Sequence, residues 1–357
     1  MTKPITTNRL HGLDLARFLA YVGMVIVNFS VVMGADDAGG LFGSMITSFQ
    51  GRAAATFVVL AGVGLGLSLA PKSSNDSTTF LTKGVWLTTK RAGFLLVAGL
   101  LNMLVFSADI LHYYSFYFFF GALLASNSKT KLIGFIVLLN VVSVFLLLTL
   151  DFDKGWDYST LEYAGFWTPE GFIRNLFFNG WHPVIPWLGF LLYGIIISRI
   201  NLHSRVLQKR LIIWGLLVFV LTEMLSKLML RLASDELTQI LFATDSIPAM
   251  PLYSLAGMSV ASVIVGICLM FGDRFANSRM LRLLSAPGKQ TLTLYIAHIL
   301  IGMSILDELG MIGVAQPPAL VLAVALSFVA VMLIYANIWQ AYFKRGPLEA
   351  LMRKVTG

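Results

Sequence analysis

The stretch LIGFIVLLNVVSVFLLLTL at residues 132–150 carries no charged side chain and decides the class of the fold. At a rise of about 1.5 Å per residue, a helix of this length matches the roughly 30 Å hydrocarbon core of a bilayer. Over the whole chain of 357 residues, 57% are hydrophobic and only 12% are charged. Soluble domains have about 25% charged residues. The composition therefore excludes a soluble enzyme and predicts an integral membrane protein.

Similar apolar segments follow one another along the chain, and no polar stretch is long enough to form a second, soluble domain. We expect an all-α polytopic integral membrane protein of about ten transmembrane helices, forming one domain over residues 1–357. The predicted spans are 14–33, 53–70, 90–107, 110–127, 131–150, 183–199, 211–230, 251–272, 289–306 and 317–340.

The connectors between these segments alternate in charge. Basic residues gather before residue 14, in 71–91, 129–131, 199–210 and 273–289, and in the tail, whereas the intervening connectors are mostly acidic. Because positively charged connectors stay on the cytoplasmic side, both termini are predicted to be cytoplasmic, in the plasma (cytoplasmic) membrane. This topology accounts for the net charge of +8 without any nucleic-acid partner.

The longest connector on the predicted outer side, 151–182, is rich in aromatic residues, including Trp156, Tyr163 and Trp167. Tryptophan and tyrosine favour the boundary between membrane and water, and irregular backbone at membrane depth must be buried in protein. We therefore expect this extracytoplasmic connector to fold back over the outer end of the helices in a lid-like manner.

Several chemistries are disfavoured by what the sequence lacks. Its single cysteine, Cys268, lies inside an apolar segment, so it can form neither an intramolecular disulfide nor a thiolate cluster. No HExxH, CxxC or Walker-type phosphate loop occurs in the chain. We therefore expect no metal, and nucleotide hydrolysis is disfavoured.

Charged side chains within the apolar segments need an explanation, because inserting each costs about 2.5–3.5 kcal/mol. Arg9, Asp14 and Arg17 lie at the start of the first segment. Asp14 and Arg17 are spaced for an ion pair along a helix, and the arginines are equally suited to bind an anionic ligand. In the seventh segment, Glu223 and Lys227 are spaced four apart, which favours pairing along one helix face.

Other polar residues lie toward the middle or the predicted outer half of the segments. Asn28, in the first segment, is either a hydrogen-bonding contact to a neighbouring helix or a group that stabilises an oxyanion. Asp109 and His112 form either a general-base pair or a helix cap. His182 precedes two prolines at the start of a segment, and His298 lies near mid-membrane. Each histidine is equally compatible with a structural role and with a site.

Short blocks in a fixed order give a resemblance to a known family. GLDLAR at 12–17 and MVIVNF at 24–29 resemble the opening of the heparan-α-glucosaminide N-acetyltransferase family and its uncharacterised bacterial membrane relatives. The resemblance runs from the first predicted helix to the ninth. Further similar blocks are GRAAATF at 51–57, LAGVG at 60–64, KR at 90–91, DILH at 109–112, HPVIPW at 182–187 and LTLYIAH at 292–298.

This resemblance implies a membrane acyltransferase that moves an acyl group, in this family acetyl, from cytoplasmic acyl-CoA to an extracytoplasmic glycan or lipid-headgroup acceptor. Acetyl-CoA would be the donor substrate. On the donor side, the residues implied for binding are Arg9, Asp14, Arg17, Lys90 and Arg91, since arginine and lysine bind phosphates.

The catalytic residues implied by the resemblance are Asn28, His112, His182 and His298. Asn28 is similar to the active-site asparagine of the family. Eukaryotic members carry a catalytic histidine in the loop shortly after it, where this chain has aspartates at 36–37. The resemblance therefore leaves His182 or His112 as general base or acyl carrier, with Asn28 polarising the thioester carbonyl.

Two other classes of function fit the same residues. A small-molecule or lipid transporter or flippase would use intramembrane polar groups as a substrate or proton path, and a non-catalytic scaffold would use none of them. Thioester cleavage separates the acyltransferase from a transporter. The expected partners are membrane lipids and the acceptor, and assembly as a homodimer is left open.

Overall fold

The computed structural model describes residues 10–35, 39–70, 77–157, 160 and 162–357. The described part is almost entirely helical, which confirms the all-α class. Each predicted span falls on a helix, and short helices appear between them. The elements of the first half are α1 (His11–Val32), α2 (Gly40–Phe49), α3 (Arg52–Leu69), α4 (Ser77–Asn102), α5 (Leu111–Leu124), α6 (Lys129–Thr149), β1 (Trp156–Asp157), β2 (Glu162–Tyr163), α7 (Pro169–Arg174) and η2 (Asn175–Asn179).

The second half continues with longer helices joined by short ones. The final helix, at 347–356, was not among the predicted elements. These elements are α8 (Val184–Ser198), α9 (Arg205–Leu232), α10 (Glu236–Phe242), α11 (Pro251–Arg274), α12 (Arg279–Ser285), η3 (Pro287–Lys289), α13 (Thr291–Ala297), η4 (His298–Met303), α14 (Ser304–Glu308), α15 (Pro318–Tyr342) and α16 (Pro347–Thr356).

The longer of these helices have the length and apolarity of a membrane span. Among the described residues, eight helical stretches are long and apolar enough to cross a membrane. The helices at 169–179 and 184–198 form a ninth candidate span if they are taken together, with a bend of 52° between them. The predicted span at 110–127 is represented by α5, which has 14 residues and is shorter than a full crossing. The chain is therefore a multi-pass membrane protein.

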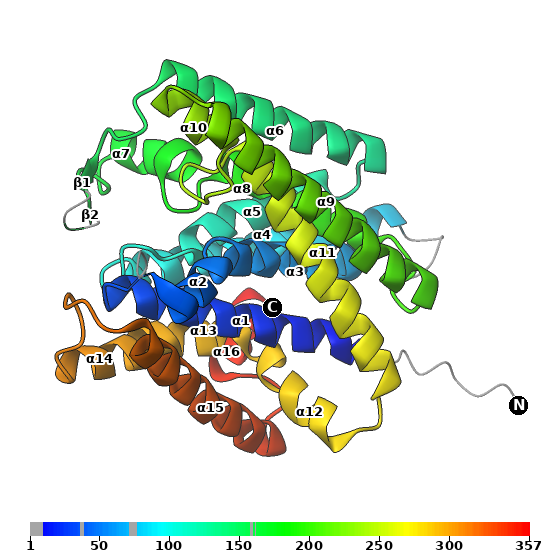
Figure 1. Cartoon of the computed structure of the whole chain (residues 1–357). Coiled ribbons are helices and arrows are strands. Elements are labelled where there is room, and N and C mark those ends of the chain that lie inside the picture. Colours follow the sequence, from blue (N-terminus) through cyan, green and yellow to red (C-terminus); the bar gives the residue numbers. More distant parts are fainter. Residues whose placement is uncertain (1–9, 36–38, 71–76, 158–159, 161) are drawn as a thin grey trace, which may run out of the picture.

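The core of the bundle lies between α1, α3, α8 and α11, which pack on one another near the middle of Figure 1. In the most apolar stretch of α1, 61% of the residues are buried, against 11% in α6. In Figure 1, α6 and α9 lie at one edge of the molecule and α15 at the other. These helices expose many large apolar side chains, as expected for helices that face lipid.

Glycines allow α3 and α8 to touch. A Cβ atom on Gly62 would lie 2.1 Å from the carbonyl oxygen of Leu191, and one on Gly194 would lie 2.0 Å from that of Val59. Without a strong hydrophobic force between helices in lipid, such close backbone packing stabilises the bundle. Gly62 and Gly194 are therefore helix-packing positions.

The start of α1 and the C-terminal helix α16 lie at one end of the bundle. Gly288 of η3 packs on the backbone of Asp14, and α16 packs on α4 and α13. We call this the basic end, because the basic connectors belong to it. Its assignment to the cytoplasm stays a prediction.

The charged residues of α9 pair differently from the prediction. Glu223 accepts a hydrogen bond from Arg52 of α3, with 2.8 Å between Nη2 and Oε1. Within the described residues, no ion pair joins Glu223 to Lys227, which is exposed. The prediction from spacing was wrong because α3 supplies an arginine at the same depth.

The connector at 151–182 is folded and packed. Its β1 and β2 form an antiparallel pair. Asn179 ties the segment together by donating from Nδ2 to the carbonyl oxygens of Phe152 (2.6 Å) and Lys154 (2.9 Å). Phe166 packs edge-on to the His112 ring, 5.7 Å between centroids. The connector thus covers the polar residues at the start of α5, and its role as a lid stays a prediction.

Candidate functional site

A central cavity of about 400 Å³ lies between α1, α3, α4, α5, η3, α13 and α16. Its end toward the basic end of the bundle is polar, and we call this end the mouth. The remaining lining is mostly apolar, with Tyr114 and Tyr295 among it. The charged residues at the mouth are Asp14, Arg17, Arg91, Lys289 and Glu349.

The two arginines at the mouth reach it from different helices. Arg17 on α1 donates to Asp14 at 2.9 Å, and Gly64 on α3 leaves room for its guanidinium, which lies 3.1 Å from the position of a Cβ there. Arg91 comes from α4, and its buried Nε has no hydrogen-bond partner in the part of the chain that the structure describes. A guanidinium held this way is suited to bind an anion.

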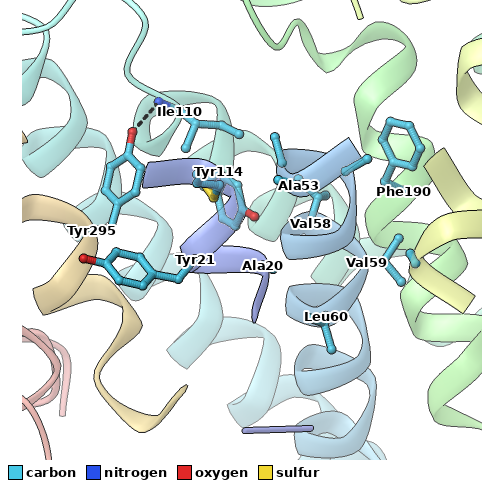
Figure 2. Packing of buried hydrophobic residues seen from close by; sticks show 14 of the residues in the cluster. Ala20, Tyr21, Ala53, Val58, Val59, Leu60, Ile110, Tyr114, Phe190 and Tyr295 are labelled. Carbon is cyan, nitrogen blue, oxygen red and sulfur yellow. Dashed lines mark hydrogen bonds between the residues drawn. The ribbon is translucent and has the colours of Figure 1, made fainter. Parts of the chain in front are cut away.

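Tyr295 connects the cavity wall to a buried carboxylate. Its hydroxyl donates to Asp109 Oδ1 at 3.1 Å and accepts from the backbone N–H of Ile110 at 3.2 Å. Figure 2 shows the ring reaching from its helix to Ile110. The hydroxyls of the neighbouring Tyr21 and Tyr114 are buried without a hydrogen-bond partner among the described residues.

Asp109 is surrounded by donors at the start of α5. Besides Tyr295, it accepts from Asn102 Nδ2 at 2.7 Å and from the backbone N–H groups of Leu111 (2.7 Å) and His112 (3.3 Å). Its Oδ2 lies 3.5 Å from His112 Nδ1. Asp109 is therefore both a helix cap and the carboxylate beside the imidazole, so the two predicted roles coexist.

His112 is fully buried, and neither ring nitrogen has a hydrogen-bond partner among the described residues. Its ring lies 3.8 Å from that of Tyr113, and Tyr113 lies 6.0 Å from the ring of His182. The Tyr113 hydroxyl is held by Asn175 Oδ1 at 2.5 Å. The structure thus brings the rings of His112 and His182 close to the ring of the same tyrosine. An imidazole beside a carboxylate, with nitrogens left for other groups, has the arrangement of a general base.

Asn28 and His298, 270 residues apart, meet in the core. Asn28 Nδ2 lies 2.9 Å from His298 Nε2, while His298 Nδ1 faces the carbonyl oxygen of Tyr295. An amide NH₂ can only donate and a carbonyl can only accept, so these partners specify an imidazole protonated at Nδ1. His298 begins the π-helical segment η4, and π-helical turns occur frequently at functional sites.

Comparison with known families places the chain in one of them. The profile described as "Heparan-alpha-glucosaminide N-acetyltransferase, catalytic" matches residues 9–230, well over half of the chain. The chain belongs to this family. A second profile, of a protein family of unknown function (DUF418), matches residues 195–357. No curated protein matches the chain at a significant level.

In this member of the N-acetyltransferase family, residues from both matched regions build the site. Arg17 and Arg91 lie in the first region, and Tyr295 and Glu349 lie in the second, yet all four line one cavity. The contact between Asn28 and His298 also joins the two regions. The site therefore needs the whole chain.

The residues predicted for donor binding divide into three groups. Asp14, Arg17 and Arg91 line the cavity. Lys90 is exposed on α4 and lies over the Trp86 ring, 5.7 Å from its centroid, outside the cavity lining. Arg9 lies outside the described residues, as do the aspartates at 36–37.

The predicted catalytic residues fall into two clusters. Asn28 pairs with His298, and His112 and His182 both lie near Tyr113. That Asn28 polarises the thioester carbonyl, with His182 or His112 as general base or acyl carrier, stays a prediction. In this structure the amide N–H of Asn28 points to His298.

Two residues escaped the sequence analysis. Asn102, which holds Asp109, precedes it by seven residues and gives no helical spacing signal. Glu349 lies in the charged tail, where it resembles an ordinary solvated residue. Its one available signal was the amphipathic pattern PLEALMRK at 347–354, which is typical of a helix at the membrane surface.

Proposed function

We propose that this protein transfers an acetyl group from acetyl-CoA, bound at the basic, cytoplasmic end, to an amino or hydroxyl group of an extracytoplasmic glycan or lipid headgroup. The observation that carries this proposal is the central cavity, which has an arginine-bearing mouth and is lined by Tyr295, the residue that donates to the buried Asp109. Membership of an N-acetyltransferase family supports the reaction type.

The cavity fits the chemistry of the donor. Arg17 and Arg91 would bind the donor phosphates at the mouth, since guanidinium groups bind phosphate through paired hydrogen bonds. The apolar interior would enclose the pantetheine arm. At about 400 Å³, the cavity lies at the small end of the range of about 300–1,000 Å³ that is usual for small-molecule sites. We therefore expect the nucleotide of the donor to lie outside the cavity, across the mouth.

The reaction requires one base. The acceptor nitrogen or oxygen attacks the thioester carbonyl carbon, the C–S bond breaks, the CoA thiolate leaves, and the acceptor proton passes to an imidazole. His112 is suited to take that proton, because the Asp109 carboxylate lies 3.5 Å from its Nδ1. His182 is the alternative, across Tyr113. An imidazole as acyl carrier would first form the acyl–nitrogen bond and then release it to the acceptor.

Donor binding is the first test. We would titrate acetyl-CoA and the unreactive analogue desulfo-CoA into the purified protein and into the Arg17→Ala/Arg91→Ala variant, using isothermal calorimetry in detergent. A hydrogen bond to a charged group contributes about 1.5–3 kcal/mol, so losing one such contact should weaken binding at least tenfold. Lys90→Ala is the matched control, since it removes one positive charge beside Arg91 but outside the cavity.

Binding that the double variant loses and Lys90→Ala retains would support the donor site. No binding by the folded wild-type protein would exclude the acetyl-CoA mechanism and would favour a transporter. Equal losses in all variants would mean that the effect is only one of overall charge.

A further inference from the structure

The C-terminal helix α16 lies across the mouth of the cavity. It contributes Glu349 and Met352 to the lining, and it packs on α4 and α13. The helix therefore contacts both the anion-binding side of the mouth and the helix that leads to His298.

Glu349 caps α13 from outside that helix. Its Oε1 accepts from the backbone N–H groups of Leu292 (2.8 Å) and Thr293 (3.2 Å), and its Oε2 accepts from Thr293 Oγ1 at 2.6 Å. Thr293 Oγ1 in turn accepts from the N–H of Leu348 at 3.0 Å. The first amides of a helix have no partner within it, and a carboxylate there is stabilised by the helix dipole.

A glycine makes this contact possible. A Cβ on Gly346, just before α16, would lie 2.2 Å from Glu349 Oε2 and 2.7 Å from Thr293 Oγ1. Both atoms belong to the same hydrogen bond. Any larger residue at 346 would therefore push Glu349 away from Thr293, which gives a second way to perturb the contact.

The contact bears on the candidate site through a short helix. Tyr295 and His298 follow Thr293 by two and five residues, within about 8 Å along a helix at 1.5 Å per residue. Gln290, just before α13, has no side-chain cap role there. A shift in the first turn of α13 therefore moves Tyr295, which donates to Asp109, and His298, which contacts Asn28.

We propose that Glu349 is a positioning residue: through its bonds to the first turn of α13, the helix α16 fixes Tyr295 and His298 relative to the cavity. This inference rests on the proposed function for its effect on turnover. The structural claim that Glu349 holds α13 does not depend on the proposed function.

The test compares Glu349→Ala with Glu349→Gln, whose amide oxygen keeps the two backbone bonds. Thr293→Val removes the hydroxyl alone, and Glu308→Ala, an exposed carboxylate at the other end of the same segment, is the matched control. The readouts are amide hydrogen exchange of the peptide over residues 290–298, and kcat and donor KM of acetyl transfer per folded protein.

We expect Glu349→Ala to speed exchange of that peptide at least tenfold and to lower kcat about tenfold with donor KM changed less than threefold. Glu349→Gln should recover most of the protection from exchange and most of kcat. Thr293→Val should add little to Glu349→Ala, because the bond between the Thr293 hydroxyl and Glu349 is already lost in that variant. If Glu349→Ala does not fold, Gly346→Ala provides the same measurement from the other side of the contact.

Unchanged exchange in Glu349→Ala would overturn the proposal. So would faster exchange with unchanged kcat, or an equal effect of Glu308→Ala. If the wild-type protein shows no acetyl transfer at all, the proposed function fails, and the exchange data alone decide whether Glu349 holds α13.

Discussion

Replacing Asp109 by asparagine separates a structural role of this residue from a catalytic one. Each carboxylate oxygen accepts from two donors: Oδ1 from Asn102 and Tyr295, and Oδ2 from the N–H groups of Leu111 and His112. In Asp109→Asn, one of these oxygens becomes an NH₂ group that faces two donors. The amide must therefore turn its nitrogen to the pair that can adapt.

The donors that can adapt are the two side chains, Asn102 and Tyr295. The Asn102 amide can rotate to present Oδ1, which has no hydrogen-bond partner among the described residues, and the Tyr295 hydroxyl can rotate to accept. The backbone N–H groups then keep their acceptor. Each hydrogen bond to a charged acceptor contributes about 1.5–3 kcal/mol, and this rearrangement recovers part of the loss. We expect the free energy of unfolding to fall by about 2 kcal/mol.

The effect on catalysis should be larger than the effect on stability. Without the carboxylate, His112 loses the anionic group that lies 3.5 Å from its Nδ1. General acid–base catalysis contributes about 10²–10⁴-fold, so we expect kcat for acetyl transfer to fall about 100-fold or more. Donor affinity should change less than threefold, because Asp109 is not among the residues that line the mouth.

The assay pairs thermal unfolding in detergent with steady-state acetyl transfer. Asn102→Ala is the control, because it removes a donor to Asp109 but leaves the carboxylate beside His112. We expect it to lower stability by a similar amount and kcat much less. A folded Asp109→Asn protein with kcat within threefold of the wild type would refute the role of His112 as base, and equal losses in the two variants would show that the effect is structural.

Two further predictions concern the bundle itself. Gly62→Ala should destabilise the protein by about 1–3 kcal/mol, as overpacking does, because its Cβ would meet the backbone of α8 at 2.1 Å. Gly93→Ala, with no atom within 4 Å of its Cβ, should be neutral or stabilise the helix by up to about 1 kcal/mol; thermal unfolding in detergent compares the two, and equal effects would contradict the packing argument. Glu223→Gln should lower the free energy of unfolding by up to about 3 kcal/mol, because it removes the charge that pairs with Arg52 in a partly buried site, whereas Lys227→Gln, an exposed residue on the same helix, should change the unfolding temperature little.

The sequence by itself determined the class of this protein and the positions of its spans. Hydropathy is a local property, summed over about 20 neighbouring residues, so it identifies the apolar helices without knowledge of their partners. It also marked Asn28, His112, His182 and His298 as unusual, because each is polar within or beside an apolar segment.

Only the tertiary structure decided which of these residues meet. The face of a helix that touches another depends on how the helices cross, and lipid-facing and core-facing sides of a span are both apolar, so spacing does not distinguish them. For that reason Arg91 lines the cavity while its neighbour Lys90 lies on the outside. The pairing of Asn28 with His298 and the capping of α13 by Glu349 join residues at least 56 positions apart. Contacts of that range arise from packing alone.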